Sequence, residues 1–214
     1  MTVTYTIGGT LFSAFGVIVS QSKGILNALK MREPSKTIWQ EHHGEAIDLA
    51  EPRYEAREIT LECIIKAANS NAFILAMTGF VAQFRQQGLQ QLVIQVDDGS
   101  TTLYPLVFMV YLSSMPDVTK TWSDANMVGT FSITLREPEP VKKVYKPGST
   151  SESVTITSDY PVNIYWGDGA YNLDVTTDTG TLSHSYIVNN NFYIVITGVI
   201  GNISGISTGA TEIW

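Results

Sequence analysis

Lysine and arginine are absent from the last third of this chain. All 13 of them lie at or before Lys146, whereas acidic residues continue to the end and give the 214-residue chain a net charge of −7. A change of composition this sharp marks a boundary between two folded units with different surfaces. The sequence therefore predicts a first domain at residues 1–140, a linker at 141–149 and a second domain at 150–214.

The composition also excludes several classes of protein. Hydrophobic residues make up 44% of the chain, which is enough for two cores, and no apolar run is long enough to cross a bilayer. A chain with a pI of about 4.9 is poorly suited to hold the phosphates of DNA or RNA. The first residues carry neither the basic nor the apolar region of a secretory signal, so we expect no such signal and no membrane insertion.

Alternating apolar and polar residues predict a mainly β first domain, an antiparallel sandwich or barrel with one packed helix. The expected strands lie at residues 5–7, 15–19, 57–66, 91–96, 103–112 and 129–137. Asp98-Gly99 is a favoured pair for a two-residue turn with positive φ. We therefore expect it to join strands 91–96 and 103–112 as a hairpin.

The helix is expected at about residues 70–87. Asn69 or Ser70 can cap its first turn, and Gly88 supplies a left-handed stop. Its apolar residues recur at helical spacing: Phe73, Met77, Phe80, Val81 and Phe84. This stripe could bind a partner, but packing over the sheet is favoured. Gly79 costs about 1 kcal/mol relative to alanine in a helix, which suggests close packing against another element.

No catalytic constellation is present in the sequence. The single cysteine, Cys63, is in phase with the apolar positions of strand 57–66, which predicts a buried apolar role and not a nucleophile. His42 and His43 are adjacent, so on a strand their side chains point to opposite faces and cannot readily chelate one ion. The common nucleophile, zinc-protease, P-loop and redox motifs do not occur. We expect no catalytic residue, no metal site, no cofactor and no enzymatic activity.

The second domain is rich in Ser, Thr, Asn and Gly, with short bursts of alternating apolar residues. Strands are expected at 153–157, 162–166 and 192–198, with turns at 159–161, 167–169 and 189–191. This spacing predicts a small Ig-like β-sandwich. Four aspartates of this domain could offer calcium ligands, but turn and surface roles are favoured because their spacing fits no loop motif: Asp159, Asp168, Asp174 and Asp178. Its many aromatic residues could stack on a sugar, although most are expected in the core or at an interface.

One set of motifs in the second domain resembles a known family. Trp166-Gly167-Asp168-Gly169 is followed by His184-Ser185-Tyr186 and by the run at 192–198. These phrases resemble the polycystic-kidney-disease (PKD) repeat, an Ig-like domain with the pattern W-G-D-G, then H-x-Y, then Y-x-V-x-V. The resemblance implies that Trp166 lies between the sheets, that Asp168 and its flanking glycines form a turn, and that His184 and Tyr186 pack the next corner. The sequence departs from the family after Gly198, so the closing strand is expected to be irregular.

The order of elements in residues 1–140 resembles a second family, the distal tail proteins and related tail-tube proteins of long-tailed bacteriophages and prophages. The resemblance rests on a short N-terminal hairpin, an irregular arm carrying Trp39, the single helix, and the runs Tyr54–Leu61 and Val128–Leu135. It implies a hexameric ring at the baseplate end of a phage tail, which joins the tail tube to the receptor-binding apparatus. Strand edges and hairpins would then pair between subunits.

The expected ring contacts are Asp98 and Gly99 in the hairpin, and Arg53 and Tyr54 in the loop 50–56. The expected partners are further copies of the chain, other tail or baseplate proteins and, through the second domain, a glycan of the host surface. The expected location is the virion tail, after synthesis in the cytoplasm of a bacterial host. The alternative function is a cell-surface adhesin or carbohydrate-binding protein.

Overall fold

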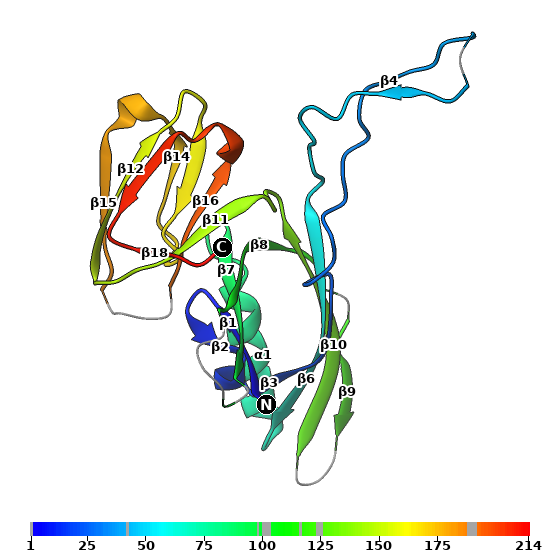
Figure 1. Ribbon diagram of the computed structural model, residues 1–214. Coiled ribbons are helices and arrows are strands. Elements are labelled where there is room, and N and C mark those ends of the chain that lie inside the picture. The colour runs from blue at the N-terminus through cyan, green and yellow to red at the C-terminus, as the bar shows by residue number, and fades with distance from the viewer. Residues whose placement is uncertain are drawn as a thin grey trace.

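The computed structural model is mainly β, with one α-helix and several antiparallel sheets (Figure 1). It describes residues 2–41, 43–97, 99, 104–115, 117–122, 126–187 and 192–214. The strands gather into two units, one built on a large sheet and one on a small sandwich. The predicted fold class is confirmed.

The first unit is an eight-stranded antiparallel sheet with the strand order β2-β1-β7-β8-β10-β6-β3, and β9 pairs with β10 outside that path. Its strands are β1 (Thr2–Ile7), β2 (Thr10–Leu11), β3 (Val17–Lys23), β6 (Arg57–Ala67), β7 (Gln90–Asp97), β8 (Leu106–Ser114), β9 (Thr119–Trp122) and β10 (Met127–Glu137). A short 3-10 helix, η1 (Phe12–Phe15), precedes β3.

Strands β6 and β10 pair along their whole length, with Phe131 opposite Cys63. Alternate residues of β6 are buried, among them Leu61 and Cys63, because residues two apart share one face of a sheet. Burial raises the pKa of the Cys63 thiol to about 12. The predicted buried, apolar role of this cysteine is confirmed.

Helix α1 (Ser70–Gln83) packs on this sheet. The Asn69 side chain caps it and accepts a hydrogen bond from the Ala72 N–H at 2.9 Å. Phe80 is fully buried and meets the ring of Phe12 edge-on, with 4.9 Å between centroids. A Cβ added to Gly79 would lie 3.2 Å from the ring of Phe15, which confirms the close packing predicted there.

The predicted end of the helix at residue 87 is wrong. The N–H of Phe84 bonds to the carbonyl of Val81, three residues earlier, so the last turn tightens and the helix stops at Gln83. Gly88 has the expected left-handed conformation, with a φ of 80°, but it lies in the turn beyond the helix.

The predicted pairing of strands 91–96 and 103–112 is confirmed, because β7 and β8 are antiparallel neighbours, but the two-residue turn predicted between them is wrong. The last residues of β7 and β8 that pair toward this turn are Ile94 and Leu106, so the connection is much longer than two residues. β1 pairs with the opposite edge of β7, and this pairing continues to Asp97 opposite Thr2, beyond the last pair that β7 makes with β8.

The second unit is a sandwich of two antiparallel sheets, with the strand orders β14-β13-β16-β11-β18 and β15-β12-β17. Its strands are β11 (Lys142–Lys146), β12 (Ser151–Thr157), β13 (Val162–Tyr165), β14 (Tyr171–Val175), β15 (Thr181–Ser185), β16 (Ile194–Gly198), β17 (Gly205–Thr208) and β18 (Thr211–Glu212). Two short 3-10 helices, η2 (Thr177–Thr179) and η3 (Ile200–Asn202), lie in its connections. Val154 and Ile156 of one sheet and Ile164 and Ile196 of the other fill its core.

Residues 141–149, predicted as a linker, contain strand β11. This strand lies inside the five-stranded sheet, between β16 and β18. The chain thus enters the sandwich of the second unit before its last lysine. Val144 and Tyr145 are buried in this sandwich, while the side chain of Lys146 is exposed. The charge boundary therefore does not coincide with the start of this sheet, and the domain limits stay a prediction.

Candidate functional site

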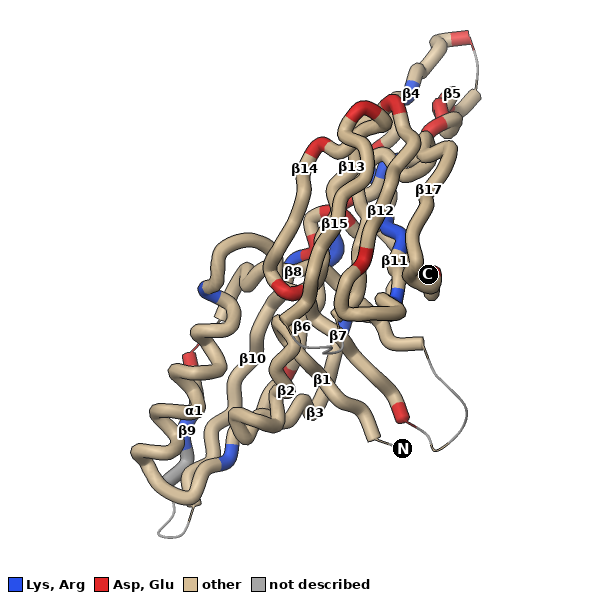
Figure 2. The backbone as a smooth tube through the Cα atoms, turned by 90° about the vertical axis from the view of Figure 1, so that its left-hand side faces the viewer, with Lys and Arg blue, Asp and Glu red and all other residues tan. Residues whose placement is uncertain are grey.

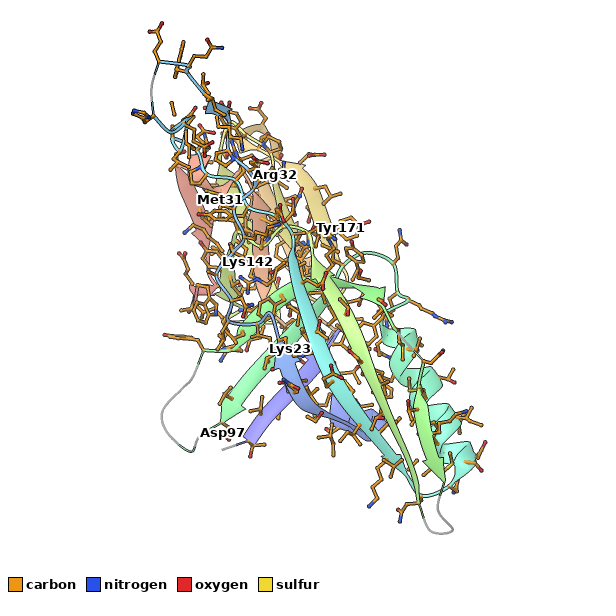
Figure 3. All side chains as sticks on the ribbon, turned by 90° about the vertical axis from the view of Figure 1, so that its right-hand side faces the viewer. Lys23, Met31, Arg32, Asp97, Lys142 and Tyr171 are labelled. Atoms are coloured by element: carbon orange, nitrogen blue, oxygen red, sulfur yellow. The ribbon has the colours of Figure 1, made fainter. Side chains whose placement is uncertain are left out.

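An arm formed by residues 24–56 projects away from both units (Figures 1 and 3). Near its tip, β4 (Lys36–Thr37) pairs with β5 (Ala46–Ile47). Large apolar side chains are exposed along it: Leu26, Met31, Ile38, Trp39, Ile47 and Leu49. A projecting segment with so many exposed apolar side chains is a candidate interaction surface.

Arg53 and Tyr54, two of the predicted ring contacts, lie at the base of this arm. The Arg53 carbonyl accepts a hydrogen bond from the Arg32 N–H at 2.7 Å. The Arg53 guanidinium lies 2.6 Å from the Glu51 carboxylate. Tyr54 forms a β-bridge with Met31. A groove of about 530 Å³ separates this base from the loops of the second unit at 138–141 and 198–202. Both residues fix the base of the arm, and their role in a ring stays a prediction.

The other two predicted contacts lie elsewhere. Asp98 is outside the described residues, and Gly99 is exposed with a φ of 77°. The Gly99 N–H donates to the Asp97 carboxylate at 2.9 Å, which is local turn chemistry. Figure 3 places Asp97 far from Arg32, at the other end of the molecule. The structure therefore does not bring the two predicted contact regions of one chain together.

Besides β2, which ends the large sheet on its other side, two strands of this sheet have a free edge. β3 pairs with β6 and β9 pairs with β10, and among the described residues neither has a partner on its other side. Ile18 on β3 is 62% exposed. A groove of about 470 Å³ between β3 and β1 is lined only by uncharged residues, within 2–5, 11–13 and 17–22. β3 carries no charged residue from Val17 to Ser22, and an uncharged edge is the kind that another chain can extend, whereas β9 contains Lys120.

The second unit is docked on the first through a shared apolar cluster. Val93, Val107 and Met109 of β7 and β8 pack against the outer face of the five-stranded sheet, where the cluster continues through Val144, Tyr165, Tyr193 and Val195. Both faces of its central strands, β11, β13 and β16, are therefore buried. The unit is not free to move as a spacer on a flexible linker.

Gln91 fixes this contact with a pair of hydrogen bonds. Its side-chain nitrogen donates to the Tyr193 carbonyl at 2.7 Å, and its side-chain oxygen accepts from the Tyr193 N–H at 3.0 Å. Gln91 is 2% exposed. The side chain satisfies both backbone groups of Tyr193 in a place that water cannot reach.

Replacing Gln91 with leucine is expected to lower the free energy of unfolding by about 1–3 kcal/mol, because it leaves the buried N–H and C=O of Tyr193 without partners. Denaturant unfolding would measure the loss, and hydrogen exchange at the Tyr193 amide should accelerate. The matched control is Gln95→Leu on the same strand, where the side chain is exposed. Equal stability of the two variants would contradict the assignment.

A buried ionic cluster lies where the first unit meets the second. The carboxylate of Glu137, 0% exposed, accepts a hydrogen bond from the Lys142 ammonium and lies 3.5 Å from Arg57 Nε. The two cations also lie over the ring of Phe108, with Lys142 Nζ 4.4 Å and Arg57 Cζ 5.3 Å from its centroid. Burial raises the pKa of Glu137 and lowers that of Lys142, and in each case the opposite charge offsets part of the shift.

The motif residues of the second unit meet at one corner of the sandwich. Trp166 is 2% exposed, and the ring of His184 stacks on it at 5.0 Å. Tyr186 meets His184 edge-on at 4.8 Å, and its hydroxyl donates to the Trp166 carbonyl at 3.0 Å. Asp168 Oδ2 lies 2.7 Å from His184 Nε2. Burial raises the pKa of the Tyr186 hydroxyl, which keeps it protonated as a donor.

Gly167 and Gly169 flank Asp168 with φ values of 94° and 99°, which favour glycine. The other carboxylate oxygen of Asp168 accepts from the Ala170 N–H at 3.1 Å and closes the turn. The structure brings the predicted motif residues together in packing and turn positions. The PKD assignment rests on the sequence motif alone and stays a prediction.

Among the described residues, no group of three or more His, Cys, Asp or Glu side chains is arranged to hold a metal ion. His42 lies outside the described residues. Within the described ranges, no helix is both long and apolar enough to span a bilayer.

Sequence reasoning missed the contact between the units, although a signal for it exists. Strands buried on one face alternate, whereas strands buried on both faces form continuous apolar runs. The runs at 92–94, 107–110 and 193–196 are continuous, and they lie in the strands that meet at this contact. No sequence pattern indicated Gln91, because a buried glutamine looks like any polar residue until its partner is known.

No family model matches the chain, and no curated protein matches it by sequence. Among solved structures, a chain of the phage P2 baseplate in its activated conformation with calcium aligns at a TM-score of 0.51 and 8% identity, over 100% of this chain and 99% of that one. The phage p2 baseplate with strontium gives 0.47 at 11% identity over 100% and 99%. The SPP1 Dit protein, described as a paradigm of the hub adsorption apparatus in phages that infect Gram-positive bacteria, gives 0.46 at 9% over 100% of both chains. The first alignment shows a shared fold.

Proposed function

We propose that this protein is a structural component of a phage or prophage tail, at the baseplate hub or distal tail ring. The observation that carries the proposal is the fold shared with a phage P2 baseplate chain over the whole length of this chain. The protein acts by self-assembly and by docking other tail proteins, without chemistry on a substrate. Its location is the virion tail.

The free strand edges supply the assembly mechanism. β3 and β9 flank the central pair β6 and β10, so the two edges belong to different sides of one copy. An interface between unlike edges is heterologous and closes into a ring when the rotation between copies allows it. Backbone hydrogen bonds between β3 of one copy and β9 of the next would extend the sheet around the ring. The number of six copies comes from the resemblance to distal tail proteins.

The arm and the second unit extend this assembly outward. The exposed apolar residues of the arm and its base at Arg53 and Tyr54 contact a neighbouring copy or the next tail protein. The second unit is rigidly docked and projects its outer sheet, which serves as a spacer or as an adhesive surface for a host glycan. Its lack of lysine and arginine after Lys146 disfavours nucleic acid as a partner.

Changing Ile18 to lysine should abolish ring formation, because a charge on the free β3 edge opposes pairing with another strand. Negative-stain imaging and sedimentation would compare the wild-type chain, alone and mixed with the proteins encoded beside it, with this variant. Ile74→Lys is the matched control, since Ile74 is similarly exposed, at 58%, on helix α1.

The wild-type chain and the control should form rings, and Ile18→Lys should remain as single copies. A wild-type chain that stays monomeric with all of its neighbours would contradict the structural role. Rings formed equally well by Ile18→Lys would leave the role intact but would exclude the β3 edge.

A further inference from the structure

The large sheet is curled, so that strands β1 and β3, which are far apart in the strand order, lie on the two sides of one groove. This groove of about 470 Å³ is lined by residues 2–5 of β1 and 17–22 of β3. A second groove, of about 540 Å³, is lined by Val3 and Tyr5 and by residues 22–27. Among the described residues β1 and β3 do not pair with each other, and we call the gap between residues 2–5 and 17–22 the β1/β3 seam.

The backbone groups of Val3 and Tyr5 point into this seam. In an antiparallel pair, successive residues point their N–H and C=O groups alternately toward the partner strand and away from it. The Gly8 N–H donates to the Gln91 carbonyl at 2.9 Å and continues the β1–β7 register, so the even-numbered residues of β1 bond to β7. β2 pairs with β1 only from Thr6 onward, which leaves the outward groups of Val3 and Tyr5 without a strand partner in the described part of the chain.

Val17 and Val19 present the same kind of edge from the other side of the seam. The Lys66 N–H donates to the Gly16 carbonyl at 3.2 Å and continues the β3–β6 register. Ile18 therefore bonds to β6, while its two neighbours point their backbone groups into the seam. The register shifts after Val19, so the regular edge ends there. Two free backbone edges thus face each other across the seam.

The two strands also run in the directions that pairing requires. The pairings β1–β7, β7–β8, β8–β10, β10–β6 and β6–β3 are all antiparallel, so β1 and β3 are antiparallel to each other. Residues 8–16 connect them, and so short a connection makes their contact cheap in loop entropy. No charge opposes the contact, because residues 2–22 contain no charged residue; the tube is tan through β1 and β2 in Figure 2.

We propose that the β1/β3 seam closes in the unassembled chain, where β3 pairs with β1 and withholds its edge from other copies. The inference rests on the function proposed above, in which β3 pairs with β9 of the next copy. Val17 and Val19 have one set of outward backbone groups, so β1 and the next copy compete for them. Closure protects an uncharged edge from indiscriminate pairing before assembly, and assembly opens the seam.

A disulfide placed across the seam tests the closure. The register that uses all four outward residues pairs Val3 with Val19 and Tyr5 with Val17. It places Thr4 opposite Ile18 in a non-hydrogen-bonded pair, with Cα atoms about 4.5 Å apart, which is within the range of a disulfide. Both of these side chains are exposed.

The double variant Thr4→Cys with Ile18→Cys should therefore form an intrachain disulfide under mild oxidation, measured by non-reducing electrophoresis and mass spectrometry of the single copies. The native Cys63 does not compete, because it is buried and its thiol pKa is raised to about 12. The matched control is Thr2→Cys with Ile18→Cys. This pair is diagonal in the closed register, with Cα atoms about 7–8 Å apart, and should crosslink at least about tenfold more slowly.

The ring experiment supplies the second readout. The oxidised Thr4→Cys/Ile18→Cys chain should lose ring formation completely, and reduction of its disulfide should restore it. Equal crosslinking rates for the two cysteine pairs, no disulfide in either, or rings formed by the oxidised chain would overturn the proposal. A wild-type chain that forms no ring with any neighbour would contradict the proposed function, and the crosslinking rates would then decide the closure of the seam by themselves.

Discussion

Trp166→Ala is expected to lower the free energy of unfolding by about 3–5 kcal/mol, the usual cost of truncating a large buried aromatic residue. Trp166 is 2% exposed, its ring stacks on His184, and its Nε1 donates to Asn172 at 2.8 Å. The substitution leaves a cavity at the corner of the sandwich and removes the hydrogen-bond partner of Asn172. Denaturant unfolding followed by tryptophan fluorescence and near-ultraviolet circular dichroism would measure the loss.

The control for this substitution is Trp39→Ala. Trp39 is 60% exposed on the arm, so its removal should change stability by less than about 0.5 kcal/mol. A loss below about 1 kcal/mol for Trp166→Ala would mean that the corner is not part of the core that holds the second unit together.

Glu137→Ala is expected to destabilise the protein by about 3–5 kcal/mol, because it leaves the buried Lys142 ammonium without its partner. Thermal and denaturant unfolding would measure the effect, and the two units should lose their coupling before the sheets unfold. Glu58→Ala is the matched control, since Glu58 is exposed on β6 and should be nearly neutral.

A second variant separates the charge from the packing. Glu137→Leu combined with Lys142→Met removes both members of the pair, and such replacements are often neutral or stabilising. Recovery of stability in the double variant would attribute the loss in Glu137→Ala to an unpaired buried charge. A double variant as unstable as Glu137→Ala would show that the ion pair is needed for the shape of this junction.

Local patterns predicted the elements that depend on local chemistry. The alternation in 57–66 corresponds to β6, and the Asn69 cap and phenylalanine spacing correspond to α1, because amphipathic periodicity and capping are properties of neighbouring residues. The positive φ of Gly167 and Gly169 is also local, because a turn residue without a Cβ adopts this conformation easily. The helix end at Gln83 was missed, since the tightened last turn at Phe84 is not encoded by a glycine or proline.

Elements that depend on distant partners were not predictable in this way. Asp98-Gly99 predicts a two-residue turn, yet the pairing of β7 with β8 ends at Ile94 and Leu106, and the last residues of β7 pair only with β1, a strand far away in sequence. Residues 142–146 have the composition of a linker, yet they pair with β16 and form part of a sheet. In both cases long-range backbone pairing outweighs a local preference, because strand formation depends on burial and cross-strand packing more than on intrinsic propensity.

The sequence by itself determined the β character of the chain, its single helix, the buried role of Cys63 and the change of surface charge after Lys146. Only the tertiary structure decided how the two units meet and which strand edges stay free. The physical reason is range: side-chain periodicity and turn chemistry act between near neighbours, whereas register, docking and exposure are set by residues that meet only after the chain has folded.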